Sequence, residues 1–258
     1  MTTQLFDISG KVAFITGGSR GIGQMIARAY VEAGVRVYIC SRKAQVSDAA
    51  AAELSAYGEC ISMPADLSDM TEVERVVTEL SAAETALHVL INNAGATWGA
   101  SIDEFPEKGW DKVLALNAKS PFFLMQKLLP LLERAGVPND PARVLNVGSV
   151  DGMHLPVFDN FSYAASKAAL HHLSRMAASH LASRHITVNV IAPGPFATDM
   201  MQPMIESMGE EKLVANVPLK RMGGPDDAAG IGIFLAARAS AFITGAVIPV
   251  DGGLLGAS

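Results

Sequence analysis

The sequence contains few cysteines, few aromatic residues and no long hydrophobic run. Cys40 and Cys60 are the only cysteines in 258 residues, which is too few for a disulfide framework and gives no metal-ligand spacing. The longest apolar stretches, such as 231–237, are far too short to span a bilayer. The first residues lack the basic and apolar segments of a secretory signal. We therefore expect a cytoplasmic protein with no metal centre and no membrane partner.

The sequence also lacks an excess of positive charge. It has 20 lysines and arginines against 26 acidic residues, a net charge of −6, so nucleic acid is not an expected partner. Half of the residues are hydrophobic and 18% are charged, a composition that can bury a sizeable core. No linker-like stretch divides the chain. We expect a single domain over residues 1–258, in which the proline- and methionine-rich segment 195–218 forms a substrate lid.

Apolar runs alternate with segments of helical periodicity along the whole chain. The first run, 11–16, does not alternate between apolar and polar residues, which is typical of a strand buried on both faces. The same pattern predicts strands over 11–16, 35–40, 60–64, 88–92, 142–147, 186–191 and 247–250, and helices over 22–33, 44–57, 70–83, 107–134, 163–183 and 225–237. Such alternation predicts an α/β fold with a single doubly wound parallel sheet (Rossmann) of about seven strands and helices on both faces.

A glycine-rich turn, 16–23, lies between the first predicted strand and the first predicted helix. Its glycines have the spacing G-x-x-x-G-x-G. Glycine allows a tight turn and lets backbone N–H groups approach a diphosphate at a helix N-terminus. Glycines in such a turn can also be purely structural, but the strand–turn–helix context favours nucleotide binding.

Tyr163 and Lys167 form a second chemical motif, because residues four apart share one face of a helix. A free tyrosine titrates near pH ~10, and a neighbouring ammonium favours the phenolate and lowers that pKa. The pair could therefore give a proton to a carbonyl oxygen or remove one from an alcohol. Taken alone, an i,i+4 Tyr–Lys pair is more often an ordinary surface pair.

Five segments, in order, resemble motifs of the short-chain dehydrogenase/reductase family, and the resemblance covers nearly the whole chain. Within that family, 18–27 is most similar to 3-oxoacyl reductases of the rhamnolipid-synthesis type. The five segments are 16–23, Asn92-Asn93-Ala94-Gly95, Tyr163-Ala164-Ala165-Ser166-Lys167, 189–194 and Asp251-Gly252-Gly253.

The resemblance implies a catalytic tetrad of Asn117, Ser149, Tyr163 and Lys167. Ser149 would hydrogen-bond the substrate oxygen, and Asn117 would hold a water that connects the lysine to solvent. Lys167 would also bind the nicotinamide ribose. The implied activity is that of an NADPH-dependent oxidoreductase that transfers hydride between nicotinamide and a ketone or secondary alcohol. A non-enzymatic alternative is a dinucleotide-sensing regulator, which could dispense with Tyr163 or Lys167.

The second predicted strand is followed by Ser41 and Arg42, where an NAD enzyme usually has a carboxylate. Arg42 and Arg20 suit a 2′-phosphate, although each could be a solvated surface arginine. We therefore expect NADP(H) to be favoured over NAD(H). The full set of expected cofactor-binding residues is Gly17, Ser19, Arg20, Gly21, Ile22, Gly23, Ser41, Arg42, Asp66, Leu67, Asn93, Ala94, Gly95, Tyr163, Lys167, Pro193, Gly194 and Thr198.

The substrate is the least determined feature. Flexible methionines in the predicted lid suit an adaptable apolar pocket, although they could equally serve lid packing. These methionines are Met200, Met201, Met204 and Met208. Apolar residues in other predicted active-site loops include Trp98, Leu155, Val157 and Phe158. The expected substrate contacts are Ser149, Met153, His154, Tyr163 and Phe196, with a solvated loop position as the alternative for His154.

These residues favour a 3-oxoacyl thioester or a similar lipophilic ketone. The alternative is a sugar, polyol or steroid-type alcohol. Arg184 matches a basic position of relatives that act on carrier-bound acyl groups, whereas Asn139 and Asp140 stand where the second such position would fall. The resemblance also suggests a homotetramer that uses the helices near 107–134 and 163–183 and the C-terminal segment, since apolar faces on long helices need cover.

Overall fold

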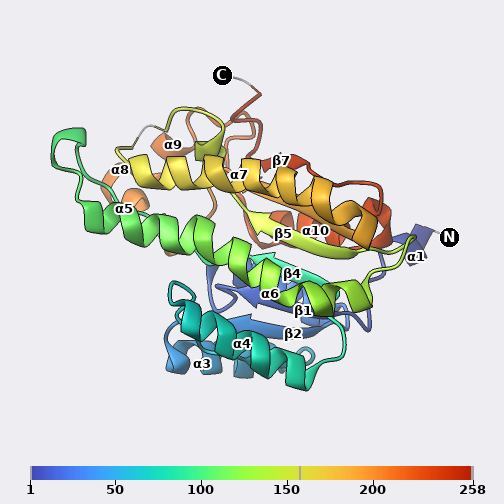
Figure 1. The fold of residues 1–258 in the computed structure, drawn as a ribbon. Helices are drawn as coiled ribbons and strands as arrows, with labels where there is room; N and C mark the ends of the chain where they lie inside the picture. The colour runs from blue at the N-terminus through green and yellow to red at the C-terminus, as the bar shows by residue number, and fades with distance from the viewer. Residues whose placement is uncertain (1, 157, 257–258) are drawn as a thin grey trace.

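The structure, a computed structural model, describes residues 2–156 and 158–256 (Figure 1). Its centre is a sheet of seven parallel strands in the order β3-β2-β1-β4-β5-β6-β7, which confirms the predicted fold class. The strands are β1 Val12–Thr16, β2 Arg36–Cys40, β3 Cys60–Ser62, β4 Val89–Asn92, β5 Ala142–Val147, β6 Ile186–Pro193 and β7 Val247–Val250. Every residue of β1, β4, β5 and β6 is buried, as the largely apolar sequences of these strands predict.

Helices cover both faces of the sheet. One face carries α2 (Gly21–Glu32), α3 (Ala44–Leu54) and α10 (Pro225–Ala236), and the other carries α4 (Met70–Ala83), α6 (Ser120–Ala135) and α7 (Phe161–Leu181). In Figure 1 the second group lies across the front of the sheet. Alternate residues of β1 face the two layers: Ala13 and Ile15 pack with the first core, and Val12 and Phe14 pack with the second.

The predicted helix over 107–134 exists, but it is not continuous. It consists of α5 (Glu107–Leu114), a π-helical turn at Ala115–Lys119, and then α6. The helix predicted over 163–183 begins two residues earlier, at Phe161, and its last turn, Ala182–Arg184, is a 3₁₀ helix. Strand β6 continues two residues beyond the prediction, to Pro193. Such ends depend on tertiary contacts and capping more than on periodicity.

Residues 195–218 connect β6 to the segment before α10. They contain the short helices α8 (Gln202–Met208) and α9 (Glu210–Leu213). Val214 and Val217 form a small separate core with Met222, which anchors this segment independently of the two main cores. The N-terminal helix α1 is Thr2–Leu5.

None of the helices in the described part of the chain is long and apolar enough to cross a membrane. Within 2–156 and 158–256, no group of three or more His, Cys, Asp or Glu side chains could hold a metal ion. Cys40 and Cys60 are buried free thiols.

Candidate active site

The candidate site lies at the edge of the sheet where the strands end. Because all seven strands are parallel, the segments that follow β1, β2, β4, β5 and β6 reach the same edge. Open parallel sheets bind ligands outside the carboxyl ends of their strands. The glycine turn follows β1, and α2 begins immediately after it, at Gly21.

The glycine turn is fixed to the end of β4. The Asn93 side-chain amide donates to the Thr16 and Gly17 carbonyls, each at 3.0 Å. Thr16 Oγ1 accepts from the backbone N–H groups of Asn93 and Ala94. A methyl group on Gly23 would lie 2.4 Å from both Gly17 O and Asn93 Nδ2. Gly17 has a φ of +66°, a backbone conformation that favours glycine. The turn therefore needs glycine at position 17 for its conformation and at position 23 for close packing. Asn93 and Ala94 therefore position the turn.

The first turn of α2 is built to face an anion. Gly21 has a φ of +55°, and the N-cap residue, Arg20, makes no side-chain capping bond, so no capping side chain takes up the backbone N–H groups there. A methyl group on Gly21 would lie 3.3 Å from Thr198 Cγ2, which places the segment after β6 directly against the turn. The guanidinium of Arg20 lies 3.6 Å from the Asp199 carboxylate, and its side chain is 70% exposed.

Arg20, which we expect to approach a 2′-phosphate together with Arg42, has an acidic neighbour in the structure. Its structural partner is Asp199, and an exposed pair of this kind contributes little stability. A phosphate would compete with Asp199 for the guanidinium. The sequence did not predict this pair, because it joins two loops 179 positions apart.

Ser41, the first residue after β2, has an unusual environment. Its Oγ is buried and has no hydrogen-bond partner, whereas Arg42 is exposed. A buried hydroxyl without a partner is unfavourable, so this atom fits a phosphate or ribose oxygen. Asp66 Oδ1 accepts from the backbone and side chain of Ser68, and Leu67 is a core residue.

Ser149, Tyr163 and Lys167 meet beyond the end of β5. Ser149 follows β5 and is buried, and Tyr163 and Lys167 lie one turn apart in α7. The Ser149 side chain is near enough to the Tyr163 hydroxyl to lower its pKa. Lys167 Nζ donates to Val147 O at 2.8 Å and lies 5.4 Å from the centre of the Tyr163 ring. The structure thus brings three of the four predicted tetrad residues together.

Burial shifts the pKa values of Tyr163 and Lys167 in opposite directions. It raises the pKa of Tyr163 to about 12, although the Ser149 side chain lowers this pKa. Burial also lowers the pKa of Lys167 to about 8, against the effect of the Asp151 carboxylate. The net shift of the tyrosine pKa is therefore upward, opposite to the expected lowering, because desolvation of the phenolate is its largest cause. Tyr163 is therefore protonated at neutral pH.

Asn117 lies in the π-helical turn between α5 and α6 and is buried. Its Oδ1 accepts from Ala96 N–H at 2.8 Å, and its Nδ2 donates to Ala96 O and to Ser166 Oγ. A methyl group on Gly95 would lie 3.5 Å from Asn117 Oδ1 and 3.7 Å from Lys167 Nζ, so Gly95 separates these two side chains. The Asn117 amide therefore joins the loop after β4 to α7, and the water-holding role stays a prediction.

The predicted substrate residues have different environments. Met153 is exposed, and His154 Nε2 lies 3.7 Å from the Asp151 carboxylate. Phe196 is only 4% exposed, and a methyl group on Gly223 would lie 2.6 Å from its ring, so it is a core residue with little surface left for substrate. Val157 lies outside the described residues. Pro193 and Gly194 follow at the end of β6, where a methyl group on Gly194 would lie 2.8 Å from Asp251 Cα.

Three further residues at the site were not predicted from the sequence. Ser166 accepts from Asn117 and donates to the Tyr163 carbonyl. The backbone N–H of Asp151 donates to Ser149 Oγ at 3.1 Å, and its carboxylate accepts from Asn160 Nδ2. His171 accepts from the Ser149 backbone N–H. The spacing of His171, four residues after Lys167, was the one available signal, since it places both on the same helix face.

Comparisons with known proteins agree with this geometry. A family model described as enoyl-(acyl carrier protein) reductase matches residues 17–255. The rhamnolipids biosynthesis 3-oxoacyl-[acyl-carrier-protein] reductase of Pseudomonas aeruginosa is 47% identical over 96% of this chain and 97% of its own length. The 2-dehydro-3-deoxy-D-gluconate 5-dehydrogenase of Dickeya dadantii is 34% identical over 99% of both chains.

A solved structure, the Pseudomonas aeruginosa RhlG/NADP active-site complex, superposes with a TM-score of 0.94 at 46% identity, covering 97% of this chain and 98% of that one. Matches of this length and identity extend across the glycine turn, the Ser149 segment and α7. They agree with the motifs in the sequence and with the seven-stranded sheet. The chain belongs to the short-chain dehydrogenase/reductase family of oxidoreductases.

Proposed function

We propose that this protein is an NADPH-dependent reductase of a 3-oxoacyl thioester or a similar lipophilic ketone, and that it also runs the reverse alcohol oxidation. The observation that carries the proposal is the grouping of Ser149 and Tyr163 beside the buried Lys167 at the carboxyl edge of the sheet. Both hydroxyls can donate to one substrate oxygen. Such convergence suits a carbonyl group, whose oxygen gains charge as it is reduced.

The proton in this reaction comes from Tyr163. The phenol is protonated at neutral pH, and the Lys167 ammonium, 5.4 Å from the centre of the ring, would stabilise the phenolate as the proton leaves. Ser149 Oγ already accepts from Asp151 N–H, so its own proton stays available for the substrate oxygen. When bound, the nicotinamide supplies the hydride. Lys167 Nζ has N–H groups beyond the one given to Val147 O, and these can hold the ribose hydroxyls.

The buried, unpartnered Ser41 Oγ and the exposed Arg42 support a preference for NADPH. The named RhlG structure contains NADP, and this chain is similar to it. Each charge-assisted phosphate contact contributes roughly 1.5–3 kcal/mol, or about one to two decades of affinity. Arg20 adds to the site only where the phosphate displaces Asp199.

Replacing Ser41 with Asp tests this preference directly. The new carboxylate repels a 2′-phosphate and accepts hydrogen bonds from free ribose hydroxyls. We expect S41D to bind NADPH at least tenfold more weakly and NADH no more weakly, since about one decade corresponds to 1.4 kcal/mol. Titration calorimetry with both dinucleotides gives the dissociation constants. Wild-type constants that are equal, or that favour NADH, contradict the preference.

Apolar side chains support a lipophilic substrate. Met153, Leu155, Met200 and Met208 are all exposed on the Ser149–Tyr163 loop and the 195–218 segment, which we propose as a lid. Arg184 precedes β6, at the opposite end of the sheet from Ser149, and pairs with Glu133. Arg184 therefore cannot bind an acidic carrier protein at the rim of the same subunit's site. The proposal accordingly concerns the acyl group of the substrate and not the docking of a carrier.

Two other reactions are candidates, and one comparison of initial rates tests them together with 3-oxoacyl reduction. A sugar-acid dehydrogenase is the second candidate, because the Dickeya dadantii relative carries that name. Reduction of an enoyl double bond is suggested by the name of the family model. Initial rates of NADPH and NADH oxidation should be compared on 3-oxoacyl thioesters of several chain lengths, their 2-enoyl counterparts and keto sugar acids. We expect the 3-oxoacyl thioesters with NADPH to give the highest kcat/KM. No turnover on any of them favours a dinucleotide-sensing regulator.

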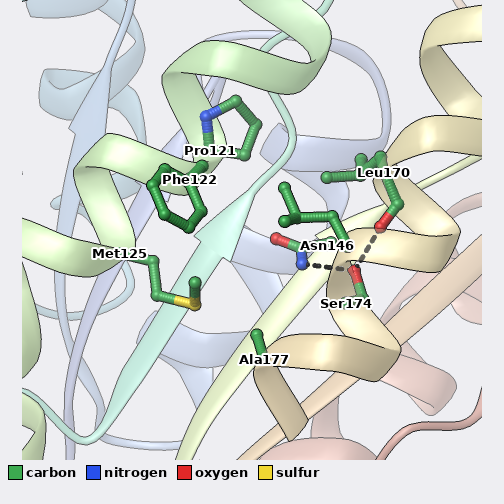
Figure 2. A pocket seen from close by; sticks show the side chains of 8 residues that line it. Pro121, Phe122, Met125, Asn146, Leu170, Ser174 and Ala177 are labelled. Carbon is green, nitrogen blue, oxygen red and sulfur yellow. Dashed lines mark hydrogen bonds between the residues drawn. The ribbon is translucent and has the colours of Figure 1, made fainter. Parts of the chain in front are cut away.

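We also propose a homotetramer in the cytoplasm. A shallow depression, too small to enclose a water molecule, lies between α6 and α7, and Phe122, Met125, Leu173 and Ala177 are among its lining residues (Figure 2). At its floor, Asn146 donates to Ser174, whose hydroxyl donates to Leu170 O, so the polar groups there are satisfied (Figure 2). An apolar depression with a satisfied floor suits helix packing from a second copy.

A further inference from the structure

The Ser149 segment rests on a buried histidine that the proposed chemistry does not use. His171 lies one turn after Lys167 in α7, and its side chain is 4% exposed. Its Nε2 atom accepts from the Ser149 backbone N–H at 3.4 Å. The imidazole thus touches the residue that donates to the substrate oxygen, on the side away from the hydroxyl.

The residues on either side of Ser149 leave room for this ring. A methyl group on Gly148 would lie 2.2 Å from His171 Nε2, and one on Gly152 would lie 2.8 Å from His171 Cε1. Real side-chain carbons do not approach so closely, so position 148 needs glycine for the imidazole to reach Ser149. A methyl group on Gly152 would also lie 2.8 Å from Ala168 N and Lys167 C, so this glycine lets the loop pack against both the ring and the α7 backbone.

His171 is held as a neutral acceptor. Burial lowers its pKa to about 4, and the positive charges of Lys167 and Arg175 act in the same direction. A neutral imidazole carries one N–H and one acceptor nitrogen, and the Ser149 N–H requires the acceptor at Nε2. If the ring were protonated, its Nε2–H group would face the Ser149 backbone N–H, and no hydrogen bond could form between these two donors.

We infer that His171 is a positioning residue for Ser149, an inference that rests on the proposed function. Its Nε2 fixes the Ser149 backbone, and the bond from Asp151 N–H to Ser149 Oγ fixes the side chain. Together these bonds aim the Ser149 hydroxyl at the same point as the Tyr163 phenol. Without the imidazole acceptor, Ser149 adopts further orientations in which its hydroxyl does not donate to the substrate oxygen.

Two substitutions separate the acceptor from the packing. His171→Leu keeps a similar volume but removes the acceptor, and His171→Gln keeps a side-chain acceptor of similar reach. We expect H171L to lower kcat about three- to tenfold, the range of one net hydrogen bond, with an unchanged NADPH dissociation constant. H171Q should restore most of kcat. His172, exposed on the same helix, gives the matched control H172L, which should behave as wild type.

The results decide the inference as follows. Folded H171L with a wild-type kcat overturns it, and so does an equal loss in H171L and H171Q, which would show that only packing matters. A second measurement does not depend on activity. ¹⁵N NMR of the histidine side chains, with the His171 signals assigned through H171Q, should show Nε2 without a proton at neutral pH. A proton on Nε2 overturns the inference, whether or not the enzyme turns over a ketone. A failure to turn over any ketone would instead reject the proposed function.

Discussion

Lys167 is the residue whose charge is most sensitive to pH at this site. Burial lowers its pKa to about 8, so a fraction of the molecules loses the ammonium just above neutral pH. The nearby Asp151 carboxylate opposes this shift and raises the lysine pKa. Because the ammonium stabilises the Tyr163 phenolate that forms during reduction, the rate should fall as pH rises through about 8.

Replacing Asp151 with Asn should move this alkaline limb to lower pH. The variant removes the negative charge that raises the Lys167 pKa, so the ammonium is lost earlier. Profiles of kcat/KM for ketone reduction from pH 6 to 10 measure the shift. Asp159→Asn, at an exposed position of the same loop, serves as the control and should leave the limb in place. A limb that stays fixed or moves upward in D151N contradicts the assignment.

At the residue scale, the sequence could predict that Tyr163 and Lys167 are neighbours, because helical spacing fixes that. It could not predict the direction of the tyrosine pKa, because desolvation depends on which loops cover α7. The sequence also could not predict the partner of Arg20, because Asp199 belongs to a segment far away in the chain. His171 was passed over because its role depends on a glycine in another loop.

The π-helical turn is the element that connects the two halves of the site. Ala115–Lys119 interrupts the predicted long helix, and Asn117 in this turn bonds to Ala96 and Ser166. A π-turn is rare and is often found at functional sites. Its position follows from hydrogen bonds to the loop after β4 and to α7, which periodicity within 107–134 does not contain. The strands, in contrast, were predictable because burial on both faces leaves largely apolar sequences.

Asn117→Ala should therefore destabilise the fold as well as the site. It leaves the half-buried Ala96 N–H and carbonyl, and the buried Ser166 hydroxyl, without their side-chain partner, at up to roughly 1–3 kcal/mol for each unsatisfied group. We expect the free energy of unfolding, from urea denaturation, to fall by about 2 kcal/mol or more. Asn139→Ala, at an exposed position, should change it by less than about 0.5 kcal/mol. Equal stability of the two variants would rule out the linking role of Asn117.

The whole molecule exposes apolar surface on α7 and near the C-terminus. Met176 of α7 is half exposed, and Phe242, shortly before β7, is fully exposed. Isolated exposed apolar residues are common, but these lie on the segments proposed to pack between subunits. The sheet order itself could be predicted from the βα alternation and the family resemblance. The contacts between copies could not, because they depend on shape.

Light scattering should give a mass of about four protomers of 27.1 kDa for the wild type, as the proposed tetramer requires. Met176→Glu places a charge in the proposed interface and should lower the mass at micromolar concentration. Val46→Glu, which changes a similarly exposed apolar residue on α3, should not. A monomeric wild type, or equal masses for both variants, would count against the tetramer.

The central claim is that Tyr163 gives the proton in an NADPH-dependent ketone reduction. Single-turnover mixing of the NADPH-loaded enzyme with a 3-oxoacyl thioester, followed by the loss of NADPH absorbance, measures it most directly. Tyr163→Phe keeps the ring and removes only the donor, so NADPH binding should be unchanged while the turnover rate falls roughly 10²–10⁴-fold. A Y163F enzyme that oxidises NADPH at close to the wild-type rate would show that another group supplies the proton.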